Sequence, residues 1–286
     1  MNKIFNSVDK PNIKGNEIFS GIPKRKLQYP LTEVQLKEYQ DKGFVILKEV
    51  FSKAEMDFLS VEADDLQNRG VELCKKLGYD PEHNLRVSLC DYLDKRTAWK
   101  IDPFSSWSPI FSSFLKDRRI CDKLATIYDG HEPLLFKDKL IYKPPGSDGN
   151  ALHQDYNWWQ GFPNSLISIC IPLDKTTKEN GCTELYTGYQ RGFLHQEGKM
   201  EGLEGHECVK DEQLTYAELN PGDIAIFNCL VPHEAKSNTS ENFRRAMFIT
   251  YNDSRDGEFY NAHYRHYHWY ITRYLDKELQ SKKYFF

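Results

Sequence analysis

The sequence predicts an all-β core that carries flanking helices, most of them on the N-terminal side. From about residue 133 onward, short runs rich in β-branched and aromatic residues alternate with turns built from Gly, Pro, Asn and Asp, which is the pattern of successive short strands. Before that point, apolar residues recur mainly at helical spacing. Short strands joined by turns are typical of an antiparallel sandwich or barrel. The chain has 286 residues, 40% of them hydrophobic, so we expect one packed domain over residues 1–286.

The region after residue 30 is expected to form a helix, a strand and a second helix. Thr32 and Gln35 have the spacing of a capping box, in which two side chains bind free amides at a helix start. Ser52 and Glu55 repeat this spacing before the second helix. Gly43 is expected to end the first helix, because glycine readily adopts the left-handed conformation found there.

The remaining elements follow in order along the chain. Apolar residues between 110 and 128 recur at helical spacing and predict one further helix. The aromatic segment 260–286 returns to helix-like spacing after a β core at 133–252. Strands are expected at residues 44–47, 134–143, 165–173, 182–186, 224–231 and 245–252.

Charge and cysteine content argue against several classes of protein. The formal net charge of −4 gives no support for a nucleic-acid partner. Residues 1–30 are polar and aperiodic, so we expect a loose arm whose basic run at 24–26 lies in solvent. The seven cysteines include no CxxC pair, so neither a disulfide framework nor a Cys-rich zinc site is indicated. Free thiols, no signal-peptide core and no membrane-length apolar run lead us to expect a cytoplasmic protein without a membrane partner.

His153 and Asp155 are the first candidates for metal binding. On a strand, residues two apart point to the same face, so an imidazole and a carboxylate could meet one ion. The alternative is a surface histidine beside a turn that the aspartate caps. A third candidate ligand is His233, which follows the apolar run at 224–231, although taken alone it is better explained as a loop histidine. Two histidines and one carboxylate form the facial triad of non-haem Fe(II) oxygenases.

Arg244 lies eleven residues after His233 at the start of a predicted strand. Alternation puts Arg244, Phe248 and Thr250 on one face, together with Ala246. A guanidinium that points into a small barrel is costly unless it meets an anion, and a dicarboxylate could bind it through a bidentate contact. For the neighbouring Arg245, we expect a surface charge.

The motifs in order closely resemble the phytanoyl-CoA dioxygenase family of Fe(II)/2-oxoglutarate-dependent oxygenases. The resemblance begins at "GFVILKEVFS" (43–52) and continues through the His-x-Asp motif. It extends past "NGCTELYTGYQRG" (180–192) and "PGD" (221–223) to the distal histidine and the arginine eleven residues on. It implies a double-stranded β-helix (jelly roll, cupin-like) fold.

The resemblance also implies a reaction and a set of ligands. His153, Asp155 and His233 would bind Fe(II), and Arg244 would anchor the cosubstrate 2-oxoglutarate. Dioxygen would then be used to hydroxylate, or otherwise oxidise, an unactivated C–H bond of a small-molecule metabolite, with release of succinate and CO2. Halogenases of this kind replace the carboxylate with a small residue to admit chloride, so Asp155 favours hydroxylation.

Further contacts are expected around this centre. Many family members carry a serine two residues after the distal histidine, where this chain has Ala235, and Thr239 is a candidate to compensate in binding 2-oxoglutarate. Four residues that alternate along the strand at 134–143 share one face: Lys137, Lys139, Ile141 and Lys143. If that face looks into the barrel, Lys139 could contact the cosubstrate and Lys137 the substrate. The alternative is that these lysines protect an exposed edge strand.

Asn157 and Trp158 directly follow the metal motif and are candidates to border the substrate, although ordinary packing is an equal alternative. Three histidines at 263, 266 and 268 are expected to form an aromatic surface or lid rather than a metal site. No basic groove for an acyl-CoA phosphate is evident, so a smaller metabolite is expected, whereas the sequence leaves the oligomeric state open. Two other hypotheses are a non-catalytic binding protein of this fold and a metal dioxygenase that does not use 2-oxoglutarate.

Overall fold

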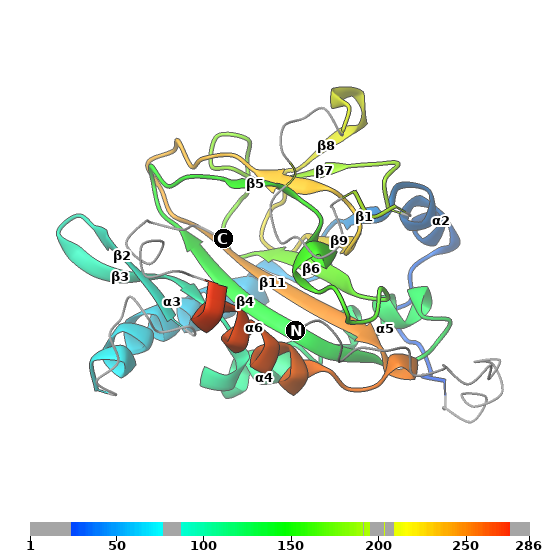
Figure 1. Ribbon diagram of the computed structural model, residues 1–286, viewed down its shortest axis with the longest axis horizontal. Helices are drawn as coiled ribbons and strands as arrows, with labels where there is room; N and C mark the ends of the chain where they lie inside the picture. The colour runs from blue at the N-terminus through cyan, green and yellow to red at the C-terminus, as the bar shows by residue number, and fades with distance from the viewer. Residues whose placement is uncertain (1–23, 77–86, 191, 195–202, 204–208, 275–286) are drawn as a thin grey trace, which may run out of the picture.

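The structure is a computed structural model that describes residues 24–76, 87–190, 192–194, 203 and 209–274. Two antiparallel sheets lie one above the other, as Figure 1 shows, so the expected all-β core is confirmed. Within the described residues, the larger sheet has the order β1 (Phe44–Leu47), β9 (Ile224–Asn228), β6 (Ile167–Pro172), β11 (Arg244–Asp253), β4 (Pro133–Lys143), β3 (Lys95–Ile101), β2 (Val87–Tyr92). The smaller sheet has the order β5 (Asn150–His153), β10 (His233–Ala235), β7 (Thr183–Tyr186), β8 (Leu214–Ala217).

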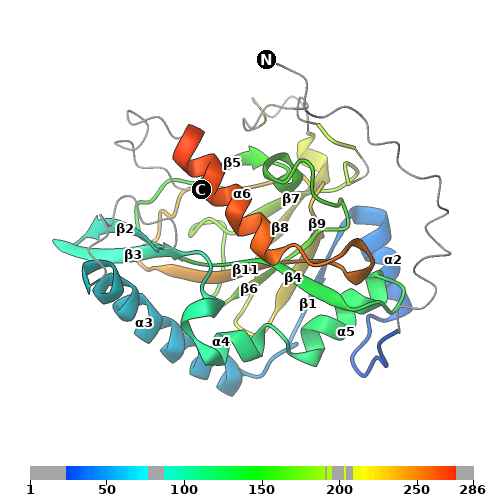
Figure 2. The same cartoon turned by 60° about the horizontal axis from the view of Figure 1, so that its bottom comes forward.

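Helices cover the outer face of the larger sheet. In Figure 2, α3, α4 and α5 run beneath this sheet, and α6 crosses near β4 on the other side. The helix bounds are α2 (Glu33–Lys42), α3 (Lys53–Lys76), α4 (Pro109–Phe114), α5 (Arg118–Ile127) and α6 (Tyr260–Tyr274). Short 3-10 helices are η1 (Ser105–Trp107), η2 (Asp155–Trp158), η4 (Asp211–Gln213) and η5 (Ser254–Asp256). Residues 275–286 of the predicted C-terminal helical segment lie outside the described residues.

The predicted helix boundaries near the N-terminus are confirmed. Thr32 and Gln35 form a complete capping box at the start of α2. Ser52 and Glu55 bind each other reciprocally before α3, with the Ser52 amide donating to Glu55 over 2.8 Å. Gly43 ends α2 with a φ of +85°, and a Cβ at this position would collide with Gln190, so both the conformation and the close approach require glycine.

The core has two layers that match the two faces of the larger sheet. One apolar cluster fills the space between this sheet and the helices, with side chains such as Leu66, Phe111 and Ile249 fully buried. A smaller cluster between the sheets includes Phe227 and Leu185. Because the second cluster is small, the space between the sheets can also hold polar side chains.

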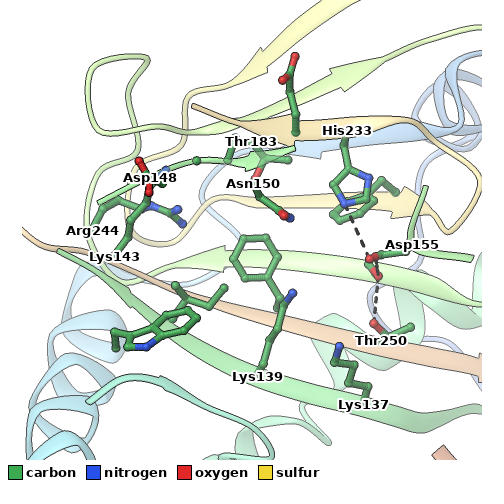
Figure 3. A pocket seen from close by; sticks show the side chains of 18 of the residues that line it. Lys137, Lys139, Lys143, Asp148, Asn150, Asp155, Thr183, His233, Arg244 and Thr250 are labelled. Atoms are coloured by element: carbon green, nitrogen blue, oxygen red, sulfur yellow. Dashed lines mark hydrogen bonds and ion pairs between the residues drawn. The ribbon is translucent and has the colours of Figure 1, made fainter. Parts of the chain in front are cut away.

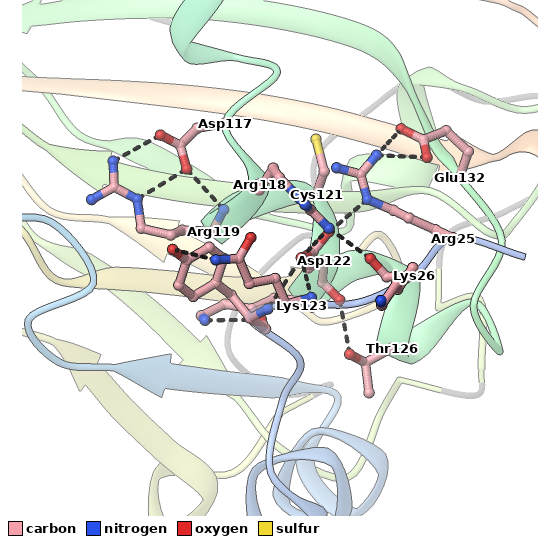
Figure 4. Close-up of polar contacts among 12 residues, drawn as sticks. Arg25, Lys26, Asp117, Arg118, Arg119, Cys121, Asp122, Lys123, Thr126 and Glu132 are labelled. Atoms are coloured by element: carbon pink, nitrogen blue, oxygen red, sulfur yellow. Dashed lines mark hydrogen bonds and ion pairs between the residues drawn. The ribbon is translucent and has the colours of Figure 1, made fainter.

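Two expectations about local structure are wrong. Residues 110–128 form two helices rather than one, because Asp117 adopts an extended conformation and its side chain accepts from the amide of Arg119 to start α5. The described part of the predicted loose arm, residues 24–30, is held in place. Arg25 contacts Asp122 over 2.6 Å and Glu132 over 2.5 Å, as Figure 4 shows. The basic run is therefore not fully in solvent.

The hairpin formed by β2 and β3 was not predicted from the sequence. Its turn places Leu93 and Asp94 at positive φ, which is the requirement of a tight two-residue hairpin turn. The hairpin extends the larger sheet beyond β4 through pairs of Lys100 with Ile141 and of Ile101 with Leu140. Within the described residues, no helix is both long enough and apolar enough to cross a membrane.

Candidate active site

His153, Asp155 and His233 converge at one edge of the space between the sheets. The Nε2 atoms of His153 and His233 lie 3.7 and 3.9 Å from Asp155 Oδ1. The two imidazole rings are 4.2 Å apart between centroids. Among the described residues, these three form the one group of acidic, histidine or cysteine side chains arranged to hold a metal ion.

The three ligand side chains meet, but not because His153 and Asp155 share one strand, as the sequence had suggested. His153 ends β5 and pairs with His233 at the start of β10, so one cross-strand pair supplies both imidazoles. His233 therefore belongs to a separate strand of the smaller sheet and not to the end of the strand predicted at 224–231. Asp155 is not on a strand but begins η2, and this turn brings its carboxylate back toward the histidines, as Figure 3 shows for Asp155 and His233.

Backbone carbonyls orient both imidazole rings. Nδ1 of His153 lies 2.7 Å from the carbonyl oxygen of Ala151, and Nδ1 of His233 lies 2.9 Å from that of Val231. Because a carbonyl oxygen only accepts, Nδ1 carries the proton and the Nε2 lone pair points to the shared centre. This is the usual way in which proteins fix a metal-binding histidine.

The carboxylate of Asp155 is oriented by a hydroxyl pair. Ser168 Oγ donates to Asp155 Oδ2 over 2.9 Å and lies 3.0 Å from Thr250 Oγ1. This contact leaves Oδ1 facing the histidines. Burial tends to raise the pKa of Asp155, but the combined effect of His233, His153 and Lys139 holds that pKa well below its usual range. Burial and His153 lower the pKa of His233 to about 4, so at neutral pH the site presents a carboxylate and a neutral imidazole, both suited to a divalent metal.

A cavity of about 760 Å³, including its open mouth, extends from this centre between the sheets. Strand β4 lines it with Lys137, Lys139, Ile141 and Lys143, and β11 lines it with Arg244, Phe248 and Thr250. The predicted alternation of both strands is therefore confirmed. In Figure 3, Arg244 and Lys143 lie at one end of the cavity, and Asp155 lies at the other.

Among the residues that the structure describes, Arg244 is buried and has no ion-pair partner. Its side chain is 3% exposed, and its Nε has no hydrogen-bond partner in the described part of the chain. Burial lowers the pKa of this guanidinium, because a charge removed from water without a counter-charge is unfavourable. An orphaned guanidinium at the far end of a metal-facing cavity fits the distal carboxylate of a dicarboxylate such as 2-oxoglutarate.

Three lysines add positive charge along the same wall. Lys143 pairs with Arg244 across the two strands and donates to the carbonyl of Lys236. Burial and the neighbouring Arg244 lower the pKa of Lys143 to about 7. Lys139 extends over the ring of Phe248, and burial followed by Lys137 lowers its pKa to about 8.

Three predicted site residues do not reach the cavity. Thr239 is exposed, and its hydroxyl donates to the carbonyl of Glu179. Asn157 is fully buried, and its side-chain oxygen accepts from Gln160 over 3.3 Å. Trp158 packs into an apolar cluster beside the cavity. The lining indole from this segment is that of Trp159, whose ring lies 5.6 Å from Lys137 Nζ.

Several site residues were not identified from the sequence. Ser168 and Thr250 orient the metal carboxylate. Alternation placed Thr250 on the face of Arg244, but a serine or threonine on a strand carries no signal for this role. Trp99 also lines the cavity. It lies in the unpredicted β3 at a bulge, since Lys100 pairs with Ser88 and Ala98 with Leu89.

The structure also shows where Arg245 and the C-terminal histidines lie. Arg245, expected as a surface charge, is partly buried and pairs with Asp174 over 2.7 Å and Asp64 over 2.7 Å. His263 is buried in an aromatic cluster, with its ring 4.5 Å from that of Phe136. His263 and His266 take part in no metal-type group of the described residues, and the side chain of residue 268 lies outside them.

Comparisons with known proteins agree with this geometry. The sequence profile of the family described as phytanoyl-CoA dioxygenase (PhyH) matches residues 39–246. A 2-aminoethylphosphonate dioxygenase from an uncultured bacterium is 29% identical over 79% of this chain and 84% of its own length. A methylphosphonate hydroxylase from Gimesia maris is 26% identical over 82% of this chain and 85% of its own.

Solved structures share the fold. The crystal structure of EctD from S. alaskensis with 2-oxoglutarate and 5-hydroxyectoine aligns with a TM-score of 0.63 and 18% identity, over 82% of this chain and 81% of EctD. The two packed sheets are thus the jelly roll of 2-oxoglutarate oxygenases. The family profile, the convergent ligand set and the unpaired arginine favour an oxygenase over both alternatives raised from the sequence. The chain therefore belongs to the phytanoyl-CoA dioxygenase family and is an Fe(II)- and 2-oxoglutarate-dependent dioxygenase.

Proposed function

We propose that the protein hydroxylates a C–H bond of a small anionic metabolite, with the following division of roles. His153, Asp155 and His233 hold Fe(II), and Arg244 with Lys139 binds 2-oxoglutarate. Lys137, together with Trp159, receives the substrate. When bound, iron and 2-oxoglutarate supply the oxidant from dioxygen, with release of succinate and CO2.

The observation that carries this proposal is the pairing of a metal-type triad with an unpaired, buried Arg244 in one cavity. The guanidinium at the closed end selects a ligand with a distal carboxylate and orients its other end toward the triad. The Asp155 carboxylate fills the position that a halide would need, which supports hydroxylation over halogenation.

An anionic substrate is supported by the charges that remain after 2-oxoglutarate is bound. Lys137 lines the cavity, and no carboxylate of the described residues lies within ion-pair distance of it. Two relatives carry the names of enzymes acting on phosphonates, which are small anions.

We propose a cytoplasmic location because the described cysteines are free thiols. Five cysteines of the described residues are free thiols, four of them buried, and thiols persist in a reducing compartment. A membrane or nucleic-acid partner finds no support in the charge of the chain.

The test compares Arg244→Met with Arg245→Met. The two arginines are adjacent on β11, but Arg245 faces the helices and pairs with Asp174, so it controls for loss of a buried charge. We expect Arg244→Met to weaken 2-oxoglutarate binding at least about 30-fold, the ratio that corresponds to about 2 kcal/mol for a buried charge pair. Arg245→Met should lose stability but keep its 2-oxoglutarate affinity.

The measurement is the visible charge-transfer band that forms when 2-oxoglutarate is titrated anaerobically into the Fe(II)-loaded protein. Fe(II) affinity should be the same in both variants and in the wild type. Equal 2-oxoglutarate affinity in Arg244→Met and wild type would refute the assigned anchor. Absence of the band in the wild type, with iron bound, would refute the proposed use of the cavity.

A further inference from the structure

A second buried lysine lies beside the cavity, near Lys137. Lys100 on β3 is 6% exposed and pairs across the sheet with Ile141, so its side chain leaves the sheet on the cavity face. Its Nζ donates to the hydroxyl of Tyr267 on α6 over 3.3 Å. The preceding bulge turns Trp99 toward the cavity as well, because a bulge breaks the strict alternation of a strand.

Lys100 and Lys137 both lie close to one aromatic ring. Their Nζ atoms are 6.0 and 5.7 Å from the ring centroid of Tyr267. An indole flanks each ammonium, since Lys100 Nζ is 5.3 Å from the ring of Trp99 and Lys137 Nζ is 5.6 Å from that of Trp159. Two ammonium groups and one phenol hydroxyl thus face a corner whose walls are aromatic.

Within the described residues, this corner holds no carboxylate in ion-pair contact with either ammonium group, although Lys100 is buried and Lys137 is half-buried. Neither lysine has an ion-pair partner among the residues the structure describes, and Asp102 acts on Lys100 only from beyond ion-pair distance. Burial lowers the pKa of Lys100. A cation–π contact is individually weak, whereas the burial of an ammonium without a counter-charge is strongly unfavourable. The aromatic walls therefore do not offset the burial of these charges.

We propose that Lys100, Lys137 and the Tyr267 hydroxyl bind a doubly charged tetrahedral headgroup of the substrate, a phosphonate or a phosphate monoester. A dianion matches two point-like ammonium groups, and its third oxygen can accept from the Tyr267 hydroxyl, whose oxygen already accepts from Lys100. A carboxylate would leave one of the two charges uncompensated. The inference rests on the proposed function, since the headgroup site lies on the same wall as Lys139 and points the rest of the substrate toward the triad.

The test measures the affinity of four probes for the protein loaded anaerobically with Fe(II) and 2-oxoglutarate. Ethylphosphonate and ethyl phosphate carry dianionic headgroups of the two possible kinds. Ethanesulfonate has the same shape with one charge, and propionate is planar with one charge. Isothermal titration calorimetry gives each dissociation constant, and repeating the titrations on metal-free protein separates the headgroup contact from the metal centre.

The variants are Lys100→Met, Lys137→Met and Tyr267→Phe, with Lys95→Met as the control because Lys95 is an exposed lysine of the same strand. We expect a dianion to bind at least tenfold more tightly than ethanesulfonate. Lys100→Met and Lys137→Met should each weaken binding of the dianion at least tenfold, and Tyr267→Phe should weaken it severalfold. Lys95→Met should leave the dissociation constant of the dianion unchanged. The stronger of ethylphosphonate and ethyl phosphate identifies the headgroup. Melting temperatures and unchanged 2-oxoglutarate affinity show that each variant is folded and that its cosubstrate site is intact.

Three outcomes would overturn the proposal. Equal binding of the sulfonate and the dianions would remove the charge argument. Unchanged dianion binding in Lys100→Met would remove that lysine from the site. If Lys100→Met and Lys137→Met weaken 2-oxoglutarate instead, these lysines serve the cosubstrate. None of these three outcomes affects the assignment of the iron ligands or of Arg244. Failure of the wild-type protein to bind 2-oxoglutarate would instead refute that assignment. The headgroup proposal would then be judged from the titrations on metal-free protein alone.

Discussion

Replacing Ser168 by alanine tests whether the hydroxyl behind Asp155 controls metal binding. Ser168 Oγ donates to Asp155 Oδ2 over 2.9 Å in a buried setting. A hydrogen bond to a charged group contributes about 1.5–3 kcal/mol, and each 1.4 kcal/mol is a factor of ten in affinity. If this bond holds the carboxylate in its metal-binding orientation, Ser168→Ala should weaken Fe(II) binding about 10- to 150-fold, in line with other residues that orient metal ligands.

The assay is an anaerobic titration of Fe(II), repeated with Co(II) to avoid oxidation. Ser147→Ala is a matched control, since the Ser147 hydroxyl is buried but has no hydrogen-bond partner within the described residues. Thr250→Val should weaken binding less, by about two- to tenfold, because Thr250 acts only through Ser168. In the double variant the two effects should not add. An Fe(II) affinity of Ser168→Ala within twofold of wild type would refute the reasoning.

Three further predictions concern stability. Burial tends to raise the pKa of Asp122, but Arg25 and two backbone amides hold this pKa below its ordinary value. The Asp122 carboxylate therefore stabilises the folded protein above about pH 4, and this stabilisation is lost as the pH falls through the folded-state pKa. Asp122→Asn should therefore lower stability at neutral pH and flatten its acid dependence in urea denaturation, and an unchanged pH profile would contradict this. Phe111→Ala should cost about 3–5 kcal/mol of unfolding free energy, because Phe111 is fully buried; a loss under 1 kcal/mol in the same assay would contradict its core role. Gly181→Ala should destabilise the folded protein more than Gly161→Ala. Both glycines have positive φ, but of the two only Gly181 lies where a Cβ would collide with a backbone carbonyl. Equal melting temperatures of the two variants would contradict this expectation.

The long strands were the most predictable part of the site. Alternation along β4 and β11 correctly predicted that Lys137, Lys139 and Arg244 lie on the cavity face, because period two holds without interruption from Lys137 to Lys143 and from Arg244 to Thr250. The same logic failed after His153. Asp155 begins a 3-10 helix, in which successive side chains rotate by about a third of a turn, so parity no longer tells which side chain faces the cavity.

The other residues that were not predicted correctly depend on contacts between distant parts of the sequence. Trp99 lines the cavity and Lys100 lies beside it only because β3 pairs with β4 and contains a bulge, and neither feature is visible in a local pattern. Thr239 was expected to compensate for Ala235 in binding 2-oxoglutarate, but its hydroxyl donates to the carbonyl of Glu179. Arg25 was taken for a solvated charge because its partners, Asp122 and Glu132, are about a hundred residues away in sequence.

The division of roles between the sheets has a mechanical consequence. The metal ligands on β5, η2 and β10 belong to the smaller sheet and its connections, whereas the cations on β4, β11 and β3 belong to the larger sheet. The distance between iron and its organic ligands therefore depends on how the sheets pack. Lys143 on β4 crosses this gap to the carbonyl of Lys236, just after β10, and Ser168 on β6 crosses it to Asp155. Each contact joins a charged or polar side chain of one sheet to the backbone or ligand of the other, at opposite ends of the cavity. Loss of either contact should therefore disturb the alignment of cosubstrate and metal even where the fold itself survives.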